Sequence, residues 1–311
     1  MAANTHRVGQ TSVYVPELAL GTGSFGATPS EVNEAEALEM VHYALDHGLN
    51  LIDTAPWYGD KVSERFVGLA LAGRSGYRLA TKVCLEFRGR DAYRMYRVDD
   101  VLRGLDGSFE RLQRDTVDIL HIHDPIYEAY DQIVSETFPA LAELKADGVT
   151  QAISVGTGDY KIARDLARDL PLDAVMLAGR YTLLEQPALD TINELRERGI
   201  SVFSAGVYNS GILATGTTSP DPKYNYQSAP PEIIARVQKL EALCGRHNVP
   251  LKAAAAQFVR AHPAMNCIVM GADSVAQIEE NIRVFSEPIP AAFWQELRES
   301  GLVDERSPLP A

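Results

Sequence analysis

The stretch SEVNEAEALEMVHYALDHGLNLIDT, residues 30–54, contains one helix followed by one strand. Apolar residues three and four positions apart predict a helix over Val32–His47, with Ser30 as its N-cap and Gly48 as its stop. The next run, Leu49–Thr54, is short and rich in apolar residues, which is typical of a buried strand. How often this unit recurs decides the fold.

The same alternation continues along nearly the whole chain. Strands are predicted at Leu18–Thr22, Leu49–Thr54, Arg78–Val83, Val117–His123, Ala152–Gly156, Ala174–Ala178, Ser201–Ala205 and Cys267–Met270. Further helices are predicted at Val98–Leu112, Glu136–Asp147, Pro187–Arg198, Glu232–His247 and Val275–Phe285. Eight strands alternating with helices indicate an α/β fold with a parallel sheet, closed as a (β/α)8 TIM barrel.

Three segments lie outside this alternation. Arg7–Val15 is expected to form a hairpin around Gly9-Gln10 before the barrel, and Lys252–Ala261 and Ala291–Ser300 are expected to be extra helices. No linker interrupts the pattern, so residues 1–311 are interpreted as one domain.

Composition excludes several classes of partner. The formal charge of −13 argues against nucleic acid, because phosphate binding needs clustered Lys and Arg. The sequence contains neither a basic amphipathic helix nor an apolar run of about 18 residues, so no contact with a membrane is expected. The three cysteines lack a CxxC pattern and the N-terminus lacks an apolar signal segment, which favours a cytoplasmic protein with reduced thiols. The oligomeric state stays open.

A glycine motif suggests a competing fold. Gly21-Thr22-Gly23-Ser24-Phe25-Gly26 matches the GxGxxG pattern of dinucleotide-binding Rossmann domains, and Asp53 ends the next strand. In that fold the glycines open the helix directly, whereas here residues 27–30 intervene. Eight β/α units also exceed the six strands of a Rossmann domain, so the barrel is favoured.

Polar residues gather at the ends of three successive strands. Asp53 and Tyr58 follow the second strand, Lys82 ends the third and His123 ends the fourth. The carboxyl ends of barrel strands meet at one face, where active sites of such barrels lie. We therefore expect these four side chains to be neighbours.

The four residues have a joint chemical use. The pKa of a free tyrosine is about 10, and a nearby ammonium such as Lys82 favours the phenolate and so lowers that pKa. Asp53 would pair with Lys82, and His123 would orient a substrate oxygen. The group could move a proton to or from an alcohol or carbonyl oxygen. The carbon then needs a hydride acceptor, which no side chain provides, so a nicotinamide is implied.

Each residue also has a simpler interpretation. Asp53 could cap a strand end, Tyr58 could lie in a surface loop, Lys82 could extend to solvent and His123 could be a hydrogen-bonded core residue. Only their coincidence at successive strand ends favours catalysis. The pair His121 and His123 would suit a metal, but no further ligands stand at other strand ends, so His121 is interpreted as a core residue and no metal site is expected.

The segments Asp53–Gly59, Ala80–Lys82 and Asp118–Pro125 resemble the catalytic segments of the aldo-keto reductases. The resemblance runs from about Ser12 to Phe285. It implies that Asp53, Tyr58, Lys82 and His123 are the catalytic residues, with Tyr58 as the proton-transfer group. It also implies that Trp57, Tyr58 and His123 contact the substrate.

The resemblance extends to the cofactor loops. Small residues in 204–211 would let the backbone approach a pyrophosphate. Phe203 resembles the aromatic residue that stacks on nicotinamide, and Glu280 and Asn281 match a pair that contacts adenine. The implied cofactor-binding residues are Gly23, Asp53, Thr157, Phe203, Ser204, Gly206, Asn209, Ser210, Gly271, Gln277, Glu280 and Asn281.

The loop after the eighth strand indicates which nicotinamide is used. NADPH-using relatives carry Lys and Arg at positions matching Gly271 and Gln277. Residues 270–281 have no Lys or Arg and carry Asp273, Glu279 and Glu280, so a 2′-phosphate would lack a cation and meet like charge. NAD is therefore expected rather than NADP.

Residues 177–186 and 208–214 resemble the sugar-oxidising branch, which includes D-threo-aldose 1-dehydrogenases acting on L-fucose or D-arabinose, and L-galactose dehydrogenase. The implied reaction is NAD-dependent oxidation of an aldose at its anomeric carbon to an aldonolactone. Oxidation of pyridoxal or another alcohol, NADPH-dependent carbonyl reduction and a regulatory nicotinamide-binding barrel are alternatives.

One feature departs from the family pattern, and the role of two loops stays open. Gly156-Thr157 replaces the usual Ser-Asn after the fifth strand, and no Gln lies in 174–179, so Thr157 is the candidate for the carboxamide. The loops Leu85–Arg97 and Ile126–Gln132 are rich in Tyr and Arg, which suits either substrate selection or plain solvated loops.

Overall fold

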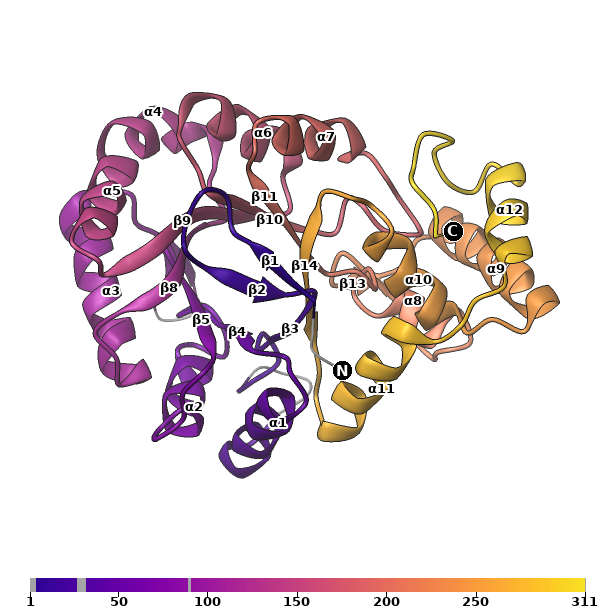
Figure 1. Cartoon of the computed structure of the whole chain (residues 1–311), viewed down its shortest axis with the longest axis horizontal. Helices are drawn as coiled ribbons and strands as arrows, with labels where there is room; N and C mark the ends of the chain where they lie inside the picture. The colour runs from indigo at the N-terminus through magenta and orange to yellow at the C-terminus, as the bar shows by residue number, and fades with distance from the viewer. Residues whose placement is uncertain (1–3, 27–31, 89–90, 311) are drawn as a thin grey trace.

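The computed structural model describes residues 4–26, 32–88 and 91–310. At its centre, eight parallel strands form a closed barrel (Figure 1), as the sequence predicts. In order around the barrel they are β3 (Leu18–Gly21), β4 (Leu51–Asp53), β5 (Arg78–Val83), β8 (Val117–His123), β9 (Thr150–Thr157), β10 (Ala174–Ala178), β11 (Ser201–Ala205) and β14 (Met265–Gly271), which pairs with β3. Closure leaves no unpaired strand edge.

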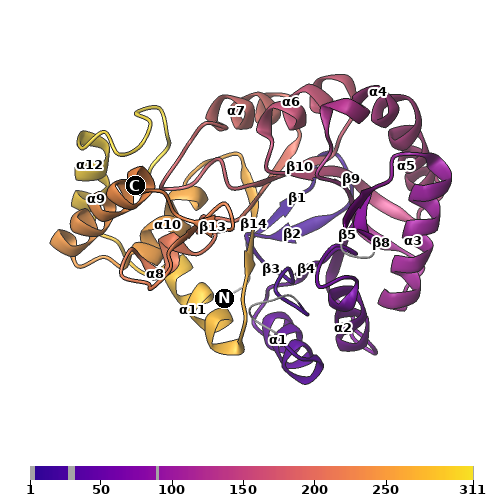
Figure 2. The same cartoon turned by 180° about the vertical axis from the view of Figure 1, so that it is seen from behind.

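Helices surround the barrel, as Figure 2 shows from behind. They are α1 (Glu34–Asp46), α2 (Val62–Ala70), α3 (Val98–Leu112), α5 (Phe138–Ala146), α6 (Tyr160–Asp169), α7 (Leu189–Glu197), α9 (Pro231–His247), α10 (Leu251–Arg260), α11 (Val275–Ser286) and α12 (Ala291–Glu299). Short helical turns are η1 (Tyr127–Ala129), α4 (Tyr130–Gln132), η2 (Ile133–Thr137) and α8 (Ile212–Thr215).

The start of α1 differs from the prediction. Asn33 caps this helix by accepting from the backbone N–H of Glu36, while the Glu36 carboxylate accepts from the backbone N–H of Asn33. This reciprocal capping box satisfies two N–H groups that a helix start leaves unpaired. The predicted cap, Ser30, lies outside the described residues.

Each barrel strand sends alternate side chains inward and outward. Ala80 and Ile119 belong to the cluster that fills the barrel interior, whereas Leu79 and Leu120 belong to the larger cluster between barrel and helices. Because strand side chains alternate, Lys82, His121 and His123 also point inward. The polar residues therefore lie above the apolar interior, at the carboxyl ends of the strands, which we call the mouth of the barrel.

A hairpin closes the opposite end of the barrel. Strands β1 (Thr5–Arg7) and β2 (Tyr14–Pro16) pair antiparallel, and Val8, Val13 and Val15 join the interior cluster. Gly9 has a φ of +50°, and a Cβ there would lie 2.7 Å from the carbonyl oxygen of Asp173, so the turn requires glycine. The predicted N-terminal hairpin is confirmed, and Figure 1 shows it lying across the barrel.

Two further hairpins are absent from the prediction. They are β6 (Leu85–Arg88) with β7 (Asp91–Arg94), and β12 (Lys223–Tyr224) with β13 (Gln227–Ser228). The first follows β5 and the second precedes α9, so both belong to the side of the barrel that carries the mouth.

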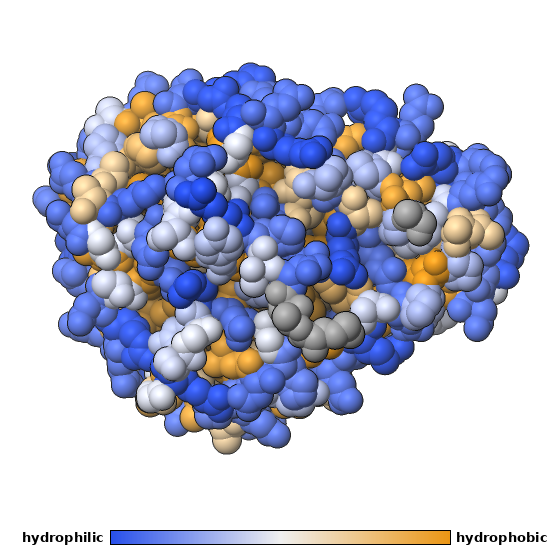
Figure 3. Space-filling view, viewed as in Figure 1, coloured by the Kyte–Doolittle hydropathy of each residue, from blue (hydrophilic) through white to orange (hydrophobic). Residues whose placement is uncertain are grey.

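The visible surface is mainly hydrophilic, with scattered apolar patches (Figure 3). No helix in residues 4–26, 32–88 and 91–310 has both the length and the apolar character needed to cross a membrane.

Candidate active site

A buried ion pair lies at the centre of the mouth. The Lys82 Nζ donates to Asp53 Oδ1 at 2.6 Å and to the backbone carbonyl of Thr54 at 2.9 Å. Both side chains are almost fully buried. Burial by itself lowers the pKa of Lys82, but the Asp53 carboxylate and Tyr58 raise it, so the lysine stays an ammonium. Water screens a charge held in this way only weakly.

Tyr58 lies directly beside this ammonium. The Lys82 Nζ is 4.8 Å from the centre of the tyrosine ring. Burial raises the pKa of Tyr58 to about 12, although Lys82 acts to lower it. The predicted net lowering of the Tyr58 pKa is therefore wrong, because desolvation outweighs the ammonium.

His123 completes the group of four. Its ring meets the ring of Tyr58 edge-on, with centroids 5.9 Å apart. Burial, with help from Lys82 and Arg94, lowers the pKa of His123 well below its ordinary value, so the imidazole is neutral. A neutral imidazole can donate one hydrogen bond and accept another. The four side chains predicted to be neighbours are brought together.

His121 lies one layer deeper and is fully buried, as expected of a core residue. Its Nε2 is 3.6 Å from Asp53 Oδ2, and burial lowers its pKa well below the ordinary value. Its ring packs edge-on against Phe203, with centroids 6.5 Å apart. A neutral His121 thus forms part of the floor below the ion pair.

The β6–β7 hairpin forms one wall of the mouth. Phe87 stacks on Trp57 with ring centroids 3.7 Å apart, and Glu86 pairs with Lys61 at 3.2 Å. On the other side, Arg94 donates to the backbone carbonyl of Asp124, directly after His123. The hairpin is therefore fastened to both flanks of the four residues.

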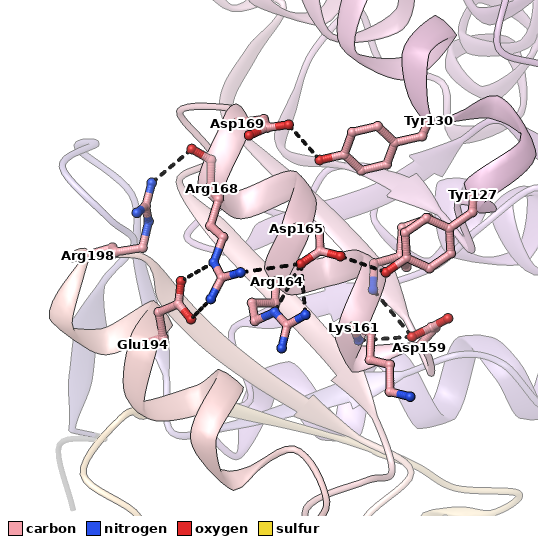
Figure 4. Close-up of polar contacts among 11 residues, drawn as sticks. Tyr127, Tyr130, Asp159, Lys161, Arg164, Asp165, Arg168, Asp169, Glu194 and Arg198 are labelled. Carbon is pink, nitrogen blue, oxygen red and sulfur yellow. Dashed lines mark hydrogen bonds and ion pairs between the residues drawn. The ribbon is translucent and has the colours of Figure 1, made fainter.

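The loop Ile126–Gln132 contacts helix α6. Tyr127 and Tyr130 donate from their hydroxyls to Asp165 and Asp169 of α6, each at 2.8 Å (Figure 4). Both tyrosines thus pack along the outside of the barrel. The hydroxyls of both tyrosines are therefore occupied by α6.

On the far side of the mouth, the loop after β11 has an unusual backbone. Gly206, Asn209, Ser210 and Gly211 all have positive φ values. The Nδ2 of Asn209 donates to Glu185 at 2.8 Å, and its buried Oδ1 has no hydrogen-bond partner within the described part of the chain. Successive left-handed residues can expose backbone N–H groups to an anion.

The loop after β14 leads into α11. Ser274 caps this helix, and the Gln277 side chain accepts from the backbone N–H of Asp273 at 2.9 Å. Asn281 donates to the carbonyl of Gly271 at 3.3 Å. The predicted residues Gly271, Gln277 and Asn281 therefore hold this loop together.

A cation stands beside Glu280 that the sequence pattern does not reveal. Lys252 of α10 donates to the Glu280 carboxylate at 2.5 Å, and Arg283 lies 3.8 Å from its other oxygen. Residues 270–281 themselves supply no cation, and Lys252 is already paired with Glu280. Lys252 is distant from this loop in sequence, and the packing of α10 against α11 brings it there.

Three residues predicted to contact the cofactor have other neighbours in this structure. Phe203 is fully buried at the inner side of β11, where its ring packs against His121. Ser204 is buried and lies two positions after Val202, so its side chain points to the same side of β11, towards the helices. Thr157 already accepts from the backbone N–H of Asp159 at 3.0 Å and bonds the Asp124 side chain.

Other predicted residues leave space or offer polar groups at the mouth. A Cβ at Gly23 would lie 3.9 Å from the Tyr58 ring, so glycine leaves that side of the tyrosine free of a side chain. The unpartnered Asn209 Oδ1 and the left-handed backbone at 209–211 offer polar groups in the loop after β11. Gly23, which belongs to the glycine motif that resembles a Rossmann fingerprint, thus leaves space beside the Tyr58 ring.

A barrel with a buried lysine, aspartate, tyrosine and histidine at its mouth has the features of an oxidoreductase that moves protons at a carbonyl or alcohol oxygen. The sequence profile described as Aldo/keto reductase family matches residues 17–301. The chain belongs to the aldo-keto reductase family.

Several relatives cover nearly the full chain. It is 33% identical to D-threo-aldose 1-dehydrogenase of a Pseudomonas species, over 93% of this chain and 95% of the relative. It is 32% identical to pyridoxal 4-dehydrogenase of Microbacterium luteolum, over 97% and 98%. It is 31% identical to L-galactose dehydrogenase of Arabidopsis thaliana, over 90% and 87%.

A solved structure supports the fold. The aldo-keto reductase AKR11C1 from Bacillus halodurans, in its holo form, superposes with a TM-score of 0.83 over 97% of both chains, at 24% identity. The chain is therefore an oxidoreductase with the (β/α)8 fold of its family.

Proposed function

We propose that this protein is an NAD-dependent dehydrogenase that oxidises an aldose at its anomeric carbon to an aldonolactone. The observation that carries the proposal is the contact of Tyr58 with the buried Lys82–Asp53 pair, beside a neutral His123. We also propose that the chain acts as one catalytic domain, because the barrel strands run from Leu18 to Gly271.

Tyr58 is proposed as the general base. Oxidation removes the proton of the sugar's anomeric hydroxyl and a hydride from the same carbon. The Tyr58 phenolate takes the proton and becomes a phenol, while the Lys82 ammonium stabilises the phenolate beforehand. His123 holds the anomeric oxygen through its neutral imidazole. A bound nicotinamide supplies the hydride acceptor.

The residues proposed to hold the dinucleotide lie on two loops. The left-handed backbone around Asn209 and Ser210 would bind the pyrophosphate, and the start of α11 would bind the adenosine end. NAD is favoured over NADP because the Glu280 carboxylate lies on this helix and already occupies Lys252. A 2′-phosphate would meet a negative charge there.

An aldose is favoured because two of the three relatives named above are sugar dehydrogenases. Pyridoxal is the second candidate, because a pyridoxal dehydrogenase is almost equally similar and is covered over nearly its full length.

The first experiment is a substrate panel. Purified protein with NAD+ is mixed with L-fucose, D-arabinose, L-galactose or pyridoxal, and NADH absorbance is followed; each assay is repeated with NADP+. Growth of signal with NAD+ and one sugar is the expected result. Turnover of pyridoxal alone would favour the second candidate, and faster turnover with NADP+ would contradict the cofactor assignment.

The role of Tyr58 is tested with Tyr58→Phe. The variant keeps the ring but loses the hydroxyl, so turnover is expected to fall by at least about a hundredfold. Calorimetric titration is expected to give NAD+ affinity within about threefold of the unaltered protein, since the ring contacts remain. Substantial turnover by this variant would show that another group is the base.

A further inference from the structure

A tyrosine at the tip of the β12–β13 hairpin has an unexpected backbone. Asn225 and Tyr226 form the two-residue turn, with φ values of +49° and +61°. Glycine is favoured at such left-handed turn positions, because a bulky side chain is strained there. Strain of this kind is retained where the side chain has a use.

The ring of Tyr226 is also unusually accessible. Its exposed fraction is 90%, the highest among the exposed large apolar residues of the described chain. Within that part of the chain its hydroxyl makes no hydrogen bond, whereas the exposed Tyr127 bonds Asp165. Neither packing nor hydrogen bonding inside the protein therefore accounts for a tyrosine here.

The turn is fixed to two loops of the mouth. The backbone N–H of Tyr226 donates to Ser210 Oγ at 3.0 Å, in the loop after β11. Arg180, which follows β10, donates to Asn225 Oδ1 at 3.2 Å, and Tyr224 donates to Glu185 at 3.0 Å. These bonds hold the tip over the ends of β10 and β11.

This anchoring sets Tyr226 opposite Tyr58. In the closed barrel, β10 is the fourth strand from β4 in either direction, so the loop after β4 that carries Tyr58 faces the end of β10. Tyr226 acts to raise the pKa of Tyr58, after the larger effects of burial, Lys82 and Asp53. The β12–β13 tip and the loop that carries Tyr58 therefore belong to opposite sides of the mouth.

We propose that Tyr226 is a substrate-contacting residue whose ring covers the sugar from the side opposite Tyr58. This inference rests on the proposed aldose oxidation. A pyranose or furanose ring has a face of C–H groups, and an exposed aromatic ring offers a flat apolar surface of matching size. The hairpin then acts as a fixed arm that presents this ring to the mouth.

The test uses Tyr226→Gly and Tyr226→Phe. Glycine suits the left-handed turn, so the melting temperature is expected to be unchanged or higher, while the KM for the aldose rises about tenfold. The value of kcat is expected to stay within about threefold, because the groups at the reacting carbon are untouched. Tyr226→Phe retains the ring and is expected to keep the KM within about threefold.

Two binding measurements sharpen the result. In the first calorimetric titration, Tyr226→Gly is expected to bind NAD+ with the affinity of the unaltered protein. In the second, the complex of Tyr226→Gly with NADH is expected to bind the aldose about tenfold more weakly than the same complex of the unaltered protein. Tyr14→Ala is the control, since Tyr14 is another exposed tyrosine but lies on β2 at the opposite end of the barrel. It is expected to change neither value.

An unchanged KM in Tyr226→Gly overturns the inference, and so does a weakened affinity for NAD+ with normal sugar affinity, which would make Tyr226 a cofactor contact. If the unaltered protein oxidises no aldose, the proposed function fails and the inference fails with it. Oxidation of an aldose by both proteins with equal KM leaves the proposed function standing and removes the inference alone.

Discussion

Tyr58 is subject to two opposing effects. Burial raises its pKa to about 12, and the Lys82 ammonium acts to lower it. A tyrosine with a raised pKa is a phenol at neutral pH, which suits donation of a proton during reduction. Removal of a proton during oxidation needs the phenolate, whose fraction rises as the pH increases towards the pKa.

The two reaction directions should therefore differ in their pH dependence. With NAD+ and sugar, kcat is expected to rise continuously between about pH 6 and pH 9, because the phenolate becomes more abundant. With NADH and the lactone or another carbonyl substrate, kcat is expected to be nearly flat over that range. Steady-state rates in constant-ionic-strength buffers measure both profiles. An oxidation rate that falls as pH rises would contradict the assignment of Tyr58 as base.

Glu280 offers a second test at the scale of single residues. Glu280→Gln removes the carboxylate and frees Lys252, so a 2′-phosphate loses a repulsion and gains a cation. The ratio of NADP+ affinity to NAD+ affinity is expected to rise about tenfold, as measured by calorimetry. Glu279→Gln removes the same charge from the exposed neighbouring position and is the control. Equal ratios in both variants would mean that Glu280 does not decide the cofactor.

The residues at the mouth can largely be predicted from the sequence. A polar side chain at the end of an apolar strand is a local signal, and it locates Asp53, Lys82 and His123. The side of Phe203 is harder to predict, because a single position of strand parity decides whether a side chain faces the barrel interior or the helices. Lys252 reaches the loop after β14 only through the packing of α10 against α11, and Tyr226 reaches Ser210 only because its own connection folds back as a hairpin; no local pattern indicates either.

At the scale of elements, helices α2 and α3 approach each other through a glycine. A Cβ at Gly68 would lie 2.3 Å from the carbonyl oxygen of Arg111 and 2.8 Å from the backbone of Leu112. Both obstacles are backbone atoms, which cannot rotate away. The contact also supports the site, because Glu64 of α2 is buried and bonds Thr81 of β5 and Arg111 of α3.

Gly68→Ala is therefore expected to destabilise the protein by about 2 kcal/mol or more, since the two helices must move apart. Gly245→Ala is the matched control. Gly245 lies in α9, and the Cβ that alanine adds would have nothing within 4 Å, so the change should stabilise the helix by about 0.5–1 kcal/mol. Urea unfolding measures both changes. A neutral Gly68→Ala would mean that α2 is not held at this distance.

Elements are predictable in proportion to their length and periodicity. β5, β8, β10, β11 and α3 have the predicted bounds. The hairpin β12–β13 has two residues in each strand, too few for a period of two to be seen. Helix α6 is absent from the prediction although Asp159 is an N-cap ahead of Ile162 and Leu166, so a readable signal is present there.

At the scale of the whole molecule, the closed and packed barrel protects all three cysteines. Cys84, Cys244 and Cys267 are free and buried. Burial raises the pKa of the Cys84 and Cys267 thiols far above the ordinary value and that of Cys244 to about 12. Thiolates, which are the reactive form, are therefore scarce in the native protein.

Ellman's reagent is expected to label the native protein at neutral pH only slowly, and to label three thiols rapidly in denaturing urea. The slow native rate is expected to follow the unfolding equilibrium as urea is increased, because Cys267 lies in the barrel interior and Cys84 and Cys244 lie in the core cluster between barrel and helices. One thiol reacting at once in the native protein would reveal local access that the closed structure does not predict.

The stacking of Trp57 on Phe87 has a practical consequence. The chain contains two tryptophans, and the other one, Trp294, is buried in α12 against Phe293, with ring centroids 4.9 Å apart. One indole therefore lies at the mouth, while the second is packed away from it. Fluorescence emission from this protein should consist of a constant contribution and a variable one, and the variable contribution changes when a molecule enters the mouth. The enzyme thus contains its own optical reporter and needs no added label.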